Sequence, residues 1–386
     1  MSLSDLIHDT VGICSEAANL RKQQRLNRLY SRENGARPLV FVRPTRVYLR
    51  QKYALDLQLV YQDPQEYLKT ELLTKLQTYM EFDDDTPVWP LVEMWLGSPF
   101  EMSLLGTECI MLSESDPRWG APVLRSLDDV AKLRQPDFES TGMLPLAHRM
   151  YGDIEKLVSG RFEVRFPQWQ KGTLGVALVV RGDSDFYADL YDNPEGLHRL
   201  MSHIDRVAAW YEEERNKRFG VSKGDGRWGY RRYRTLGNDE VDCNLISPAH
   251  YLEFVYPYDR SYTERSAEGV YLHSCGNLTP LYRQIAALPH LEVLHISPWS
   301  DFFRALDVVD KSIILEKAFY QQDSYFQADV NKMAEEIDNL VRAAREAGRL
   351  FYFLVDADVF GDKENKRLQE WLRVCRESIA RHYGEG

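Results

Sequence analysis

The strongest constraint on the fold is a regular alternation of short apolar runs and longer amphipathic segments that begins near residue 88. Apolar runs bounded by turn residues favour strands, whereas apolar residues that recur with a helical period favour helices. The expected strands are 88–94, 175–180, 230–236, 269–273, 291–296, 312–317 and 350–355. Helix start signals lie between them, because Asn193 and Ser247 each precede a proline, as an N-cap precedes the first helical turn.

This alternation leaves two main architectures for a chain of 386 residues, a doubly wound sheet or a (β/α)8 barrel. A doubly wound dinucleotide fold needs Gly-x-Gly-x-x-Gly directly after an early strand. No such motif follows an early strand here, and no phosphate-binding P-loop sequence occurs. The sequence therefore predicts an α/β protein with a (β/α)8 barrel over 86–386, preceded by a helical extension over 1–85.

Charge and cysteine content narrow the class of function. The formal net charge of −11 disfavours general nucleic-acid binding, which relies on basic surfaces. No apolar run is long enough to cross a membrane, and the amino terminus lacks the pattern of a secretory signal. Five cysteines in so long a chain are typical of a reducing compartment. We therefore expect a cytoplasmic enzyme that contacts neither nucleic acid nor membrane.

His273 and Cys275 are the residues best suited to chemistry. They end the expected strand 269–273 and begin the loop after it, and the carboxyl ends of barrel strands carry active sites. Side chains two residues apart in an extended segment project to the same face. An imidazole and a thiolate on one face suit zinc, provided that a further ligand is present. The alternative is a His–Cys pair that only packs and hydrogen-bonds.

Three segments around this pair carry a family resemblance. They are Leu245-Ile-Ser-Pro248, Phe254-Val-Tyr-Pro-Tyr258 and His273-Ser-Cys-Gly-Asn277. Together they resemble the uroporphyrinogen decarboxylase superfamily, and especially its zinc-dependent, corrinoid-linked methyltransferase branch. Weaker similarity extends from about residue 88 to 370.

The resemblance implies a (β/α)8 barrel whose zinc ion, held by His-x-Cys and a later cysteine, activates a substrate thiol. A thiol bound to zinc loses its proton more readily and can then attack a methyl group. The methyl group would move between a small methyl donor or thiol and a corrinoid, which a separate protein partner would carry. Family members often pair, so the resemblance also suggests a homodimer.

The third zinc ligand differs from the family pattern. Where the resemblance places the later cysteine, after the strand 350–355, the sequence has Asp356 and Asp358 and no cysteine. Zinc accepts an aspartate oxygen in place of sulfur, which makes Asp358 one candidate. Cys243 is the other, because it follows the strand before that of His273. Both candidates remain open at this point.

Further residues are candidates for catalysis or substrate binding. Glu93 is a charge within an apolar strand, and buried carboxylates need partners. His295 and Asp301 accompany the next expected strand, where the family often places a polar site residue. Candidates for substrate binding are Arg50, Arg232, Arg234 and Asn277.

Two alternative functions remain. One is a metal-independent decarboxylase or lyase that binds a porphyrinogen-like polycarboxylate through Arg50 and the arginines at 231–234. The early loop keeps Arg50-Gln51 but lacks the glycine and second arginine of the decarboxylase pattern. The other alternative is a catalytically silent barrel that serves as the partner of a corrinoid protein.

Overall fold

Most of the chain's strands lie in one curled parallel sheet. The computed structural model describes residues 1–386 except 222–227, 267, 328 and 385–386. In the described part, six strands are hydrogen-bonded in the order β1-β10-β9-β8-β7-β6, and all five pairings are parallel. The bounds are β1 Leu39–Pro44, β6 Arg234–Gly237, β7 Val270–His273, β8 Leu291–Ile296, β9 Ile314–Phe319 and β10 Phe351–Ala357.

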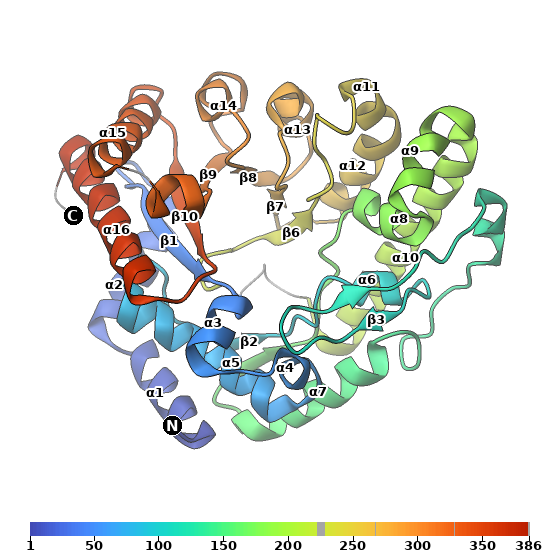
Figure 1. Ribbon diagram of the computed structural model, residues 1–386, viewed down its shortest axis with the longest axis horizontal. Helices are drawn as coiled ribbons and strands as arrows, with labels where there is room; N and C mark the ends of the chain where they lie inside the picture. Colours follow the sequence, from blue (N-terminus) through green and yellow to red (C-terminus); the bar gives the residue numbers. More distant parts are fainter. Residues whose placement is uncertain (222–227, 267, 328, 385–386) are drawn as a thin grey trace.

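Shorter strands form two small sheets. β2 (Leu91–Glu93) pairs in parallel with β5 (Glu163–Arg165), and β3 (Cys109–Ile110) pairs antiparallel with β4 (Arg118–Trp119). A parallel bridge between Lys171 and Gly237 extends the main sheet beyond β6. The result is a curled, mostly parallel sheet surrounded by helices, the general arrangement of an α/β barrel (Figure 1).

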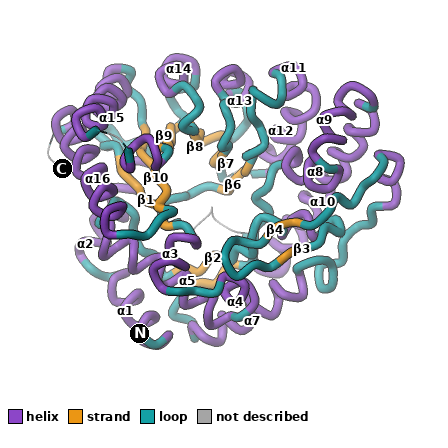
Figure 2. Tube along the Cα trace, in the orientation of Figure 1, coloured by secondary structure: helices purple, strands orange, loops and turns teal. Residues whose placement is uncertain are grey.

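Helices lie outside the strands around this sheet (Figure 2). The α-helices are α1 Leu3–Cys14, α2 Ala17–Tyr30, α3 Arg46–Tyr53, α4 Leu57–Gln62, α5 Pro64–Gln77, α6 Phe100–Ser103, α7 Leu144–Val158, α8 Thr173–Arg181, α9 Asp183–Asp192, α10 Pro194–Phe219, α11 Pro248–His250, α12 Tyr256–Arg265, α13 Tyr282–Ala286, α14 Phe302–Val308, α15 Val330–Glu346 and α16 Asp362–Tyr383. Short 3₁₀ or π turns are η1 Thr78–Phe82, η2 Leu127–Lys132, η3 Tyr251–Val255, η4 Thr279–Leu281 and η5 Gln322–Phe326. None of the helices in the described residues has the length and apolarity needed to span a lipid bilayer.

Two sequence-based expectations about the elements are wrong, and some short strands were not expected. Residues 175–180 lie in helix α8 rather than in a strand, and all of them are buried. A continuous apolar run does not distinguish a buried helix from a buried strand, which explains the error. The first 85 residues are not only helical, because β1 lies among them and pairs with β10. Strands β3, β4 and β5, which have two or three residues each, were not expected.

One Gly-x-Gly-x-x-Gly sequence does occur, at 224–229. It follows helix α10 and precedes strand β6. A dinucleotide-binding loop needs the opposite order, from strand to helix, because the helix amino terminus receives the pyrophosphate. The position in the chain therefore does not fit that function; residues 222–227 lie outside the described part.

The strands carry two different layers of side chains on one face of the curled sheet. A buried apolar cluster contains Phe41, Tyr271, Val293, Ile314 and Tyr352, together with Leu26 and Leu29 of α2. Since side chains of a strand alternate, the residue two positions further on faces the same way. These next residues are Arg43, His273, His295, Glu316 and Leu354. Four of these five side chains are polar, so the sheet changes from apolar to polar toward the carboxyl ends of its strands.

Candidate metal centre

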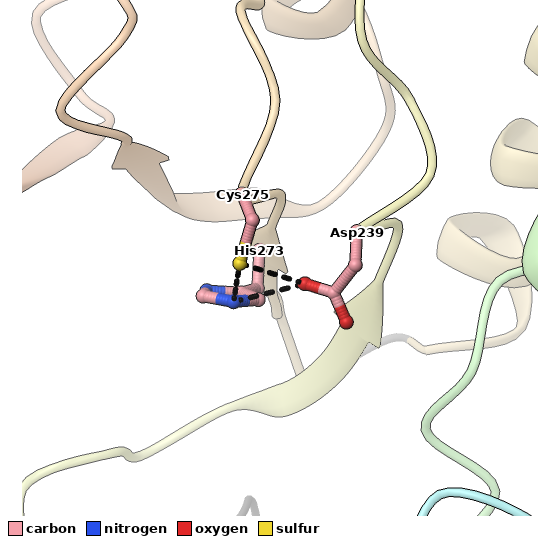
Figure 3. Close-up of side chains that lie close together, drawn as sticks. All are labelled: Asp239, His273 and Cys275. Carbon is pink, nitrogen blue, oxygen red and sulfur yellow. Dashed lines mark hydrogen bonds and ion pairs between the residues drawn. The ribbon is translucent and has the colours of Figure 1, made fainter. Parts of the chain in front are cut away.

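Three potential metal ligands converge at the carboxyl ends of β6 and β7. His273 Nε2 lies 3.1 Å from Asp239 Oδ1 and 3.5 Å from Cys275 Sγ. Cys275 Sγ lies 3.3 Å from the same Asp239 oxygen. Figure 3 shows the three side chains pointing toward one another, His273 from the end of β7 and Asp239 and Cys275 from the loops after β6 and β7. The set offers one nitrogen, one sulfur and one oxygen donor within 4.8 Å, a composition that zinc accepts.

The backbone of the two loops is held tightly around these side chains. The amide of Asn238 donates to the His273 carbonyl over 2.7 Å, which joins the loop after β6 to the end of β7. Ser274 donates from its hydroxyl to the Val241 carbonyl, and the amide of Gly276 donates to Ser274 Oγ. A Cβ atom on Gly276 would lie 2.4 Å from the Val241 oxygen, so only glycine fits at this close approach.

Charges around the centre keep Asp239 ionised. Although burial opposes ionisation, the nearby His273 and Lys171 hold the pKa of Asp239 well below its usual range. Lys171 Nζ lies 3.3 Å from Asp239 Oδ2 and 2.5 Å from Glu240 Oε1. The pKa of Cys275 rises to about 12, because burial and the adjacent Asp239 both disfavour the thiolate. In the metal-free site the thiol is therefore protonated, and a bound metal ion would displace this proton.

A buried hydrogen-bond network lies behind His273. Tyr271 Oη is 3.0 Å from His273 Nδ1, accepts a 2.9 Å hydrogen bond from Arg231, and donates to Glu316. The Arg231 guanidinium also stacks 4.1 Å from the centre of the Tyr271 ring. If His273 Nε2 is to bind a metal, Nδ1 must carry the ring proton and donate a hydrogen bond to the Tyr271 oxygen. The network therefore sets the tautomer that a metal ligand needs.

His295 completes this network on β8. Its Nδ1 lies 2.5 Å from Glu316 Oε1, and its ring centre lies 4.2 Å from that of His273. Burial and the neighbouring His273 lower the pKa of His295 to about 4, so the ring is neutral at physiological pH. His273, His295 and Glu316 form a second group of potential metal ligands. Glu316 Oε2 is buried and has no hydrogen-bond partner among the described residues.

The structure brings His273, Cys275 and His295 together and places the other two proposed ligands elsewhere. Neither Cys243 nor Asp358 belongs to the two donor groups of the described chain. The Cys243 amide donates to the Asn277 carbonyl, and burial raises the pKa of its thiol to about 11. Asp358 accepts a hydrogen bond from Gln321 beyond the end of β10. Their roles as ligands stay predictions.

The candidate catalytic residues Glu93 and Asp301 lie on other elements. Glu93 is buried on β2, where Gln168 Nε2 donates to it over 2.5 Å and Arg165 lies 3.4 Å away. Asp301 is exposed and caps helix α14 by accepting from the amide of Arg304. Both carboxylates have partners that explain their positions without a reaction. Their catalytic roles stay predictions.

The four proposed substrate-binding residues do not converge on one place. Arg50 lies 3.2 Å from the exposed Glu114, and Arg234 pairs with Glu212 at the amino end of β6. Arg232 precedes that strand and stacks over Trp89. Asn277 accepts the Thr279 amide and so orders the loop after β7. Arg234 and Arg232 therefore lie at the strand end opposite to Asp239, His273 and Cys275.

Sequence reasoning missed Asp239, Lys171, Tyr271 and Glu316 as parts of the site, and it named Arg231 only as a possible ligand of a polycarboxylate substrate. Asp239 had a readable signal, because it comes two residues after β6 just as Cys275 comes two residues after β7. Tyr271 also had one, since it lies two positions before His273 on the same strand face. Lys171 reaches the site through a bridge outside any named strand, which local sequence patterns do not reveal.

Comparison with known proteins supports the fold. No family model and no curated protein matches the sequence. Among solved structures, a methyltransferase from Methanosarcina mazei superposes with a TM-score of 0.66 over 92% of this chain and 98% of that one. The two sequences are 15% identical, so the similarity concerns the fold. The chain thus shares its overall architecture with a methyltransferase.

Proposed function

We propose that the protein is a zinc-dependent methyltransferase that moves a methyl group between a small methyl donor or thiol and a corrinoid carried by another protein. The observation that carries this proposal is the convergence of His273 Nε2, Cys275 Sγ and Asp239 Oδ1 at strand carboxyl ends. The shared architecture with a methyltransferase supports it. A complete (β/α)8 barrel of the uroporphyrinogen decarboxylase superfamily, in a reducing cytoplasm, is part of the same proposal.

The residues present fit a zinc ion of the catalytic kind. Catalytic zinc sites use three protein ligands and leave a fourth position for water or substrate. His273, Cys275 and Asp239 supply three ligands of accepted types, and Asp239 takes the place that the family resemblance gives to a second cysteine. When bound there, zinc would lower the pKa of a substrate thiol and so provide a thiolate at neutral pH.

The protein's own groups would then orient the ligands and balance charge. The Tyr271 hydroxyl oxygen accepts a hydrogen bond from Nδ1–H of His273 and holds the ring with Nε2 toward the site. Lys171 stays cationic beside Asp239 and Glu240, because these carboxylates raise its pKa despite its burial. It therefore keeps Asp239 ionised before and after ligation. The network of Arg231, Tyr271 and Glu316 fixes these positions, because its members hydrogen-bond to one another in a buried environment.

Metal analysis with matched variants tests this proposal. Purified wild-type protein is expected to hold close to stoichiometric zinc and to catalyse thiol-dependent demethylation of methylcobalamin. His273→Ala, Cys275→Ser and Asp239→Asn should each lose zinc and activity together. Cys243→Ser and Asp358→Asn serve as controls, since both residues lie outside the donor group, and should retain both properties. Full activity in metal-free protein would contradict the proposal.

A further inference from the structure

A cavity of about 350 Å³ is lined by residues near the amino end of β1 and by residues of helices α2 and α16. Figure 1 shows α2 and α16 on the same side of the molecule as β1. Four arginines line it, Arg25 and Arg28 from α2, Arg37 from the segment before β1, and Arg376 from α16. Asp85 is the one acidic residue of the lining. The whole chain has a net charge of −11, so this cluster runs against the overall composition.

Three of the four arginines form ion pairs, which leaves Arg37 as the arginine of the lining without one among the described residues. Asp85 lies 2.9 Å from Arg25 and accepts the Val40 amide with its other oxygen. Arg28 and Arg376 pair only with the exposed carboxylates of Glu33 and Asp83. Exposed pairs of this kind contribute little and exchange readily with other anions.

Arg37 makes no ion pair or hydrogen bond with any residue that the structure describes. Its partial burial and the neighbouring Arg25 lower the pKa of its guanidinium, and they outweigh the opposite effect of Asp85. A guanidinium presents several N–H donors in a plane and binds phosphate or carboxylate oxygens through two of them.

The remaining lining is apolar and includes Ala36, Pro38, Leu39 and Ile379. A cavity of this volume is in the range of small-molecule sites and is larger than a phosphate ion alone requires. A phosphate monoester carries nearly two negative charges and three acceptor oxygens at neutral pH, which matches several arginines better than a monocarboxylate does.

We propose that this cavity, which we call the arginine pocket, binds a small phosphate monoester whose phosphate contacts Arg37 and its neighbouring arginines and whose apolar body lies against the Pro38–Leu39 segment. The pocket is at the opposite end of the sheet from Asp239, His273 and Cys275. It is therefore a second binding site, and its occupancy does not depend on the metal chemistry proposed above.

Isothermal titration calorimetry with phenyl phosphate, inorganic phosphate and phenylacetate tests the proposal at fixed ionic strength, which removes differences in screening. Phenyl phosphate should bind saturably and more tightly than either other probe, because it alone has both the dianionic head and the apolar body. Arg37→Gln should weaken its binding by about tenfold or more.

Two control variants show whether phenyl phosphate binds in the arginine pocket rather than elsewhere on the protein. Arg373→Gln removes an arginine of the same helix α16 that pairs with Glu377 and does not line the pocket, so it should leave the affinity within about twofold. His273→Ala should also bind phenyl phosphate as the wild type does. The proposal is overturned if phenyl phosphate does not bind saturably, if Arg37→Gln binds it normally, if phenylacetate binds equally well, or if His273→Ala abolishes binding.

Discussion

At the scale of single residues, Asp239 shows how the site differs from the pattern that the sequence resembles. A carboxylate, a thiolate and a neutral imidazole together neutralise the two positive charges of a zinc ion, as two thiolates and an imidazole would. Oxygen is a harder donor than sulfur, so the ion would be less electron-rich and a stronger Lewis acid. Lys171 beside Asp239 strengthens this effect, because it withdraws charge from the carboxylate.

Tyr271 is expected to control metal affinity without touching the metal. Tyr271→Phe removes the acceptor for the Nδ1 proton of His273, and loss of such a partner usually weakens metal binding by roughly 10–100-fold. Competition with a chromogenic chelator would measure this change. Tyr230→Phe is the matched control, because the Tyr230 hydroxyl is buried but has no partner among the described residues. Equal zinc affinity in wild type and Tyr271→Phe would contradict the positioning role.

At the scale of elements, the strand ends could be predicted better than the path of the chain between them. Alternation and β-branched composition located β7, β8, β9 and β10 to within a few residues, because these strands are central and strongly apolar. Helix α8 was mistaken for a strand because it is buried on all sides. β1 was missed although it contains an apolar run, because the first 85 residues were taken as a helical extension. Its pairing with the distant β10 is not revealed by local patterns.

The candidate site could also be predicted from the sequence only in part. His273 and Cys275 share one strand and its loop, so their proximity follows from local geometry. The third donor comes from another strand end, and several residues of that loop have suitable chemistry. The sequence does not show that Asp239 rather than Cys243 joins the donor group of His273 and Cys275. That follows from the backbone path of the loop, in which the Cys243 amide donates to the Asn277 carbonyl.

Gly276 is expected to be essential for the loop that presents Cys275. In Gly276→Ala the new methyl group would overlap the Val241 carbonyl and the Asp242 side chain, at a cost of about 1–3 kcal/mol in the free energy of unfolding. Urea denaturation measures this cost. Gly152→Ala in helix α7, where an added Cβ meets nothing within 4 Å, should be neutral or slightly stabilising. Equal stability of the two variants would show that the loop is not closely packed.

At the scale of the whole molecule, the buried His295–Glu316 pair should make stability depend on pH. The folded protein lowers the pKa of His295 from its usual 6.5 to about 4 through burial and the nearby His273. Glu316 also has a lowered pKa, because hydrogen bonds from His295 and Tyr271 outweigh its burial. In both cases the unfolded chain binds protons more readily, but the pH windows differ. The stabilisation from His295 is lost as the pH falls from 6.5 toward 4, whereas that from Glu316 is lost only below its usual pKa of 4.5.

For His295 alone this loss amounts to roughly 3 kcal/mol over that interval. Urea denaturation of chelator-treated protein at a series of pH values would measure it. His295→Gln removes the titrating ring, so its stability should decline less steeply between pH 6.5 and 4 than that of the wild type. Parallel pH profiles for the two proteins would exclude this histidine as the cause.

X-ray absorption spectroscopy of the purified protein at the zinc edge would show whether Asp239, His273 and Cys275 hold a zinc ion. With these three ligands, the zinc ion should have one sulfur neighbour at about 2.3 Å and nitrogen or oxygen neighbours at about 2.0–2.2 Å. The sulfur should be lost in Cys275→Ser and kept in Cys243→Ser. A shell with two sulfurs, or protein that binds no zinc, would contradict the proposed centre.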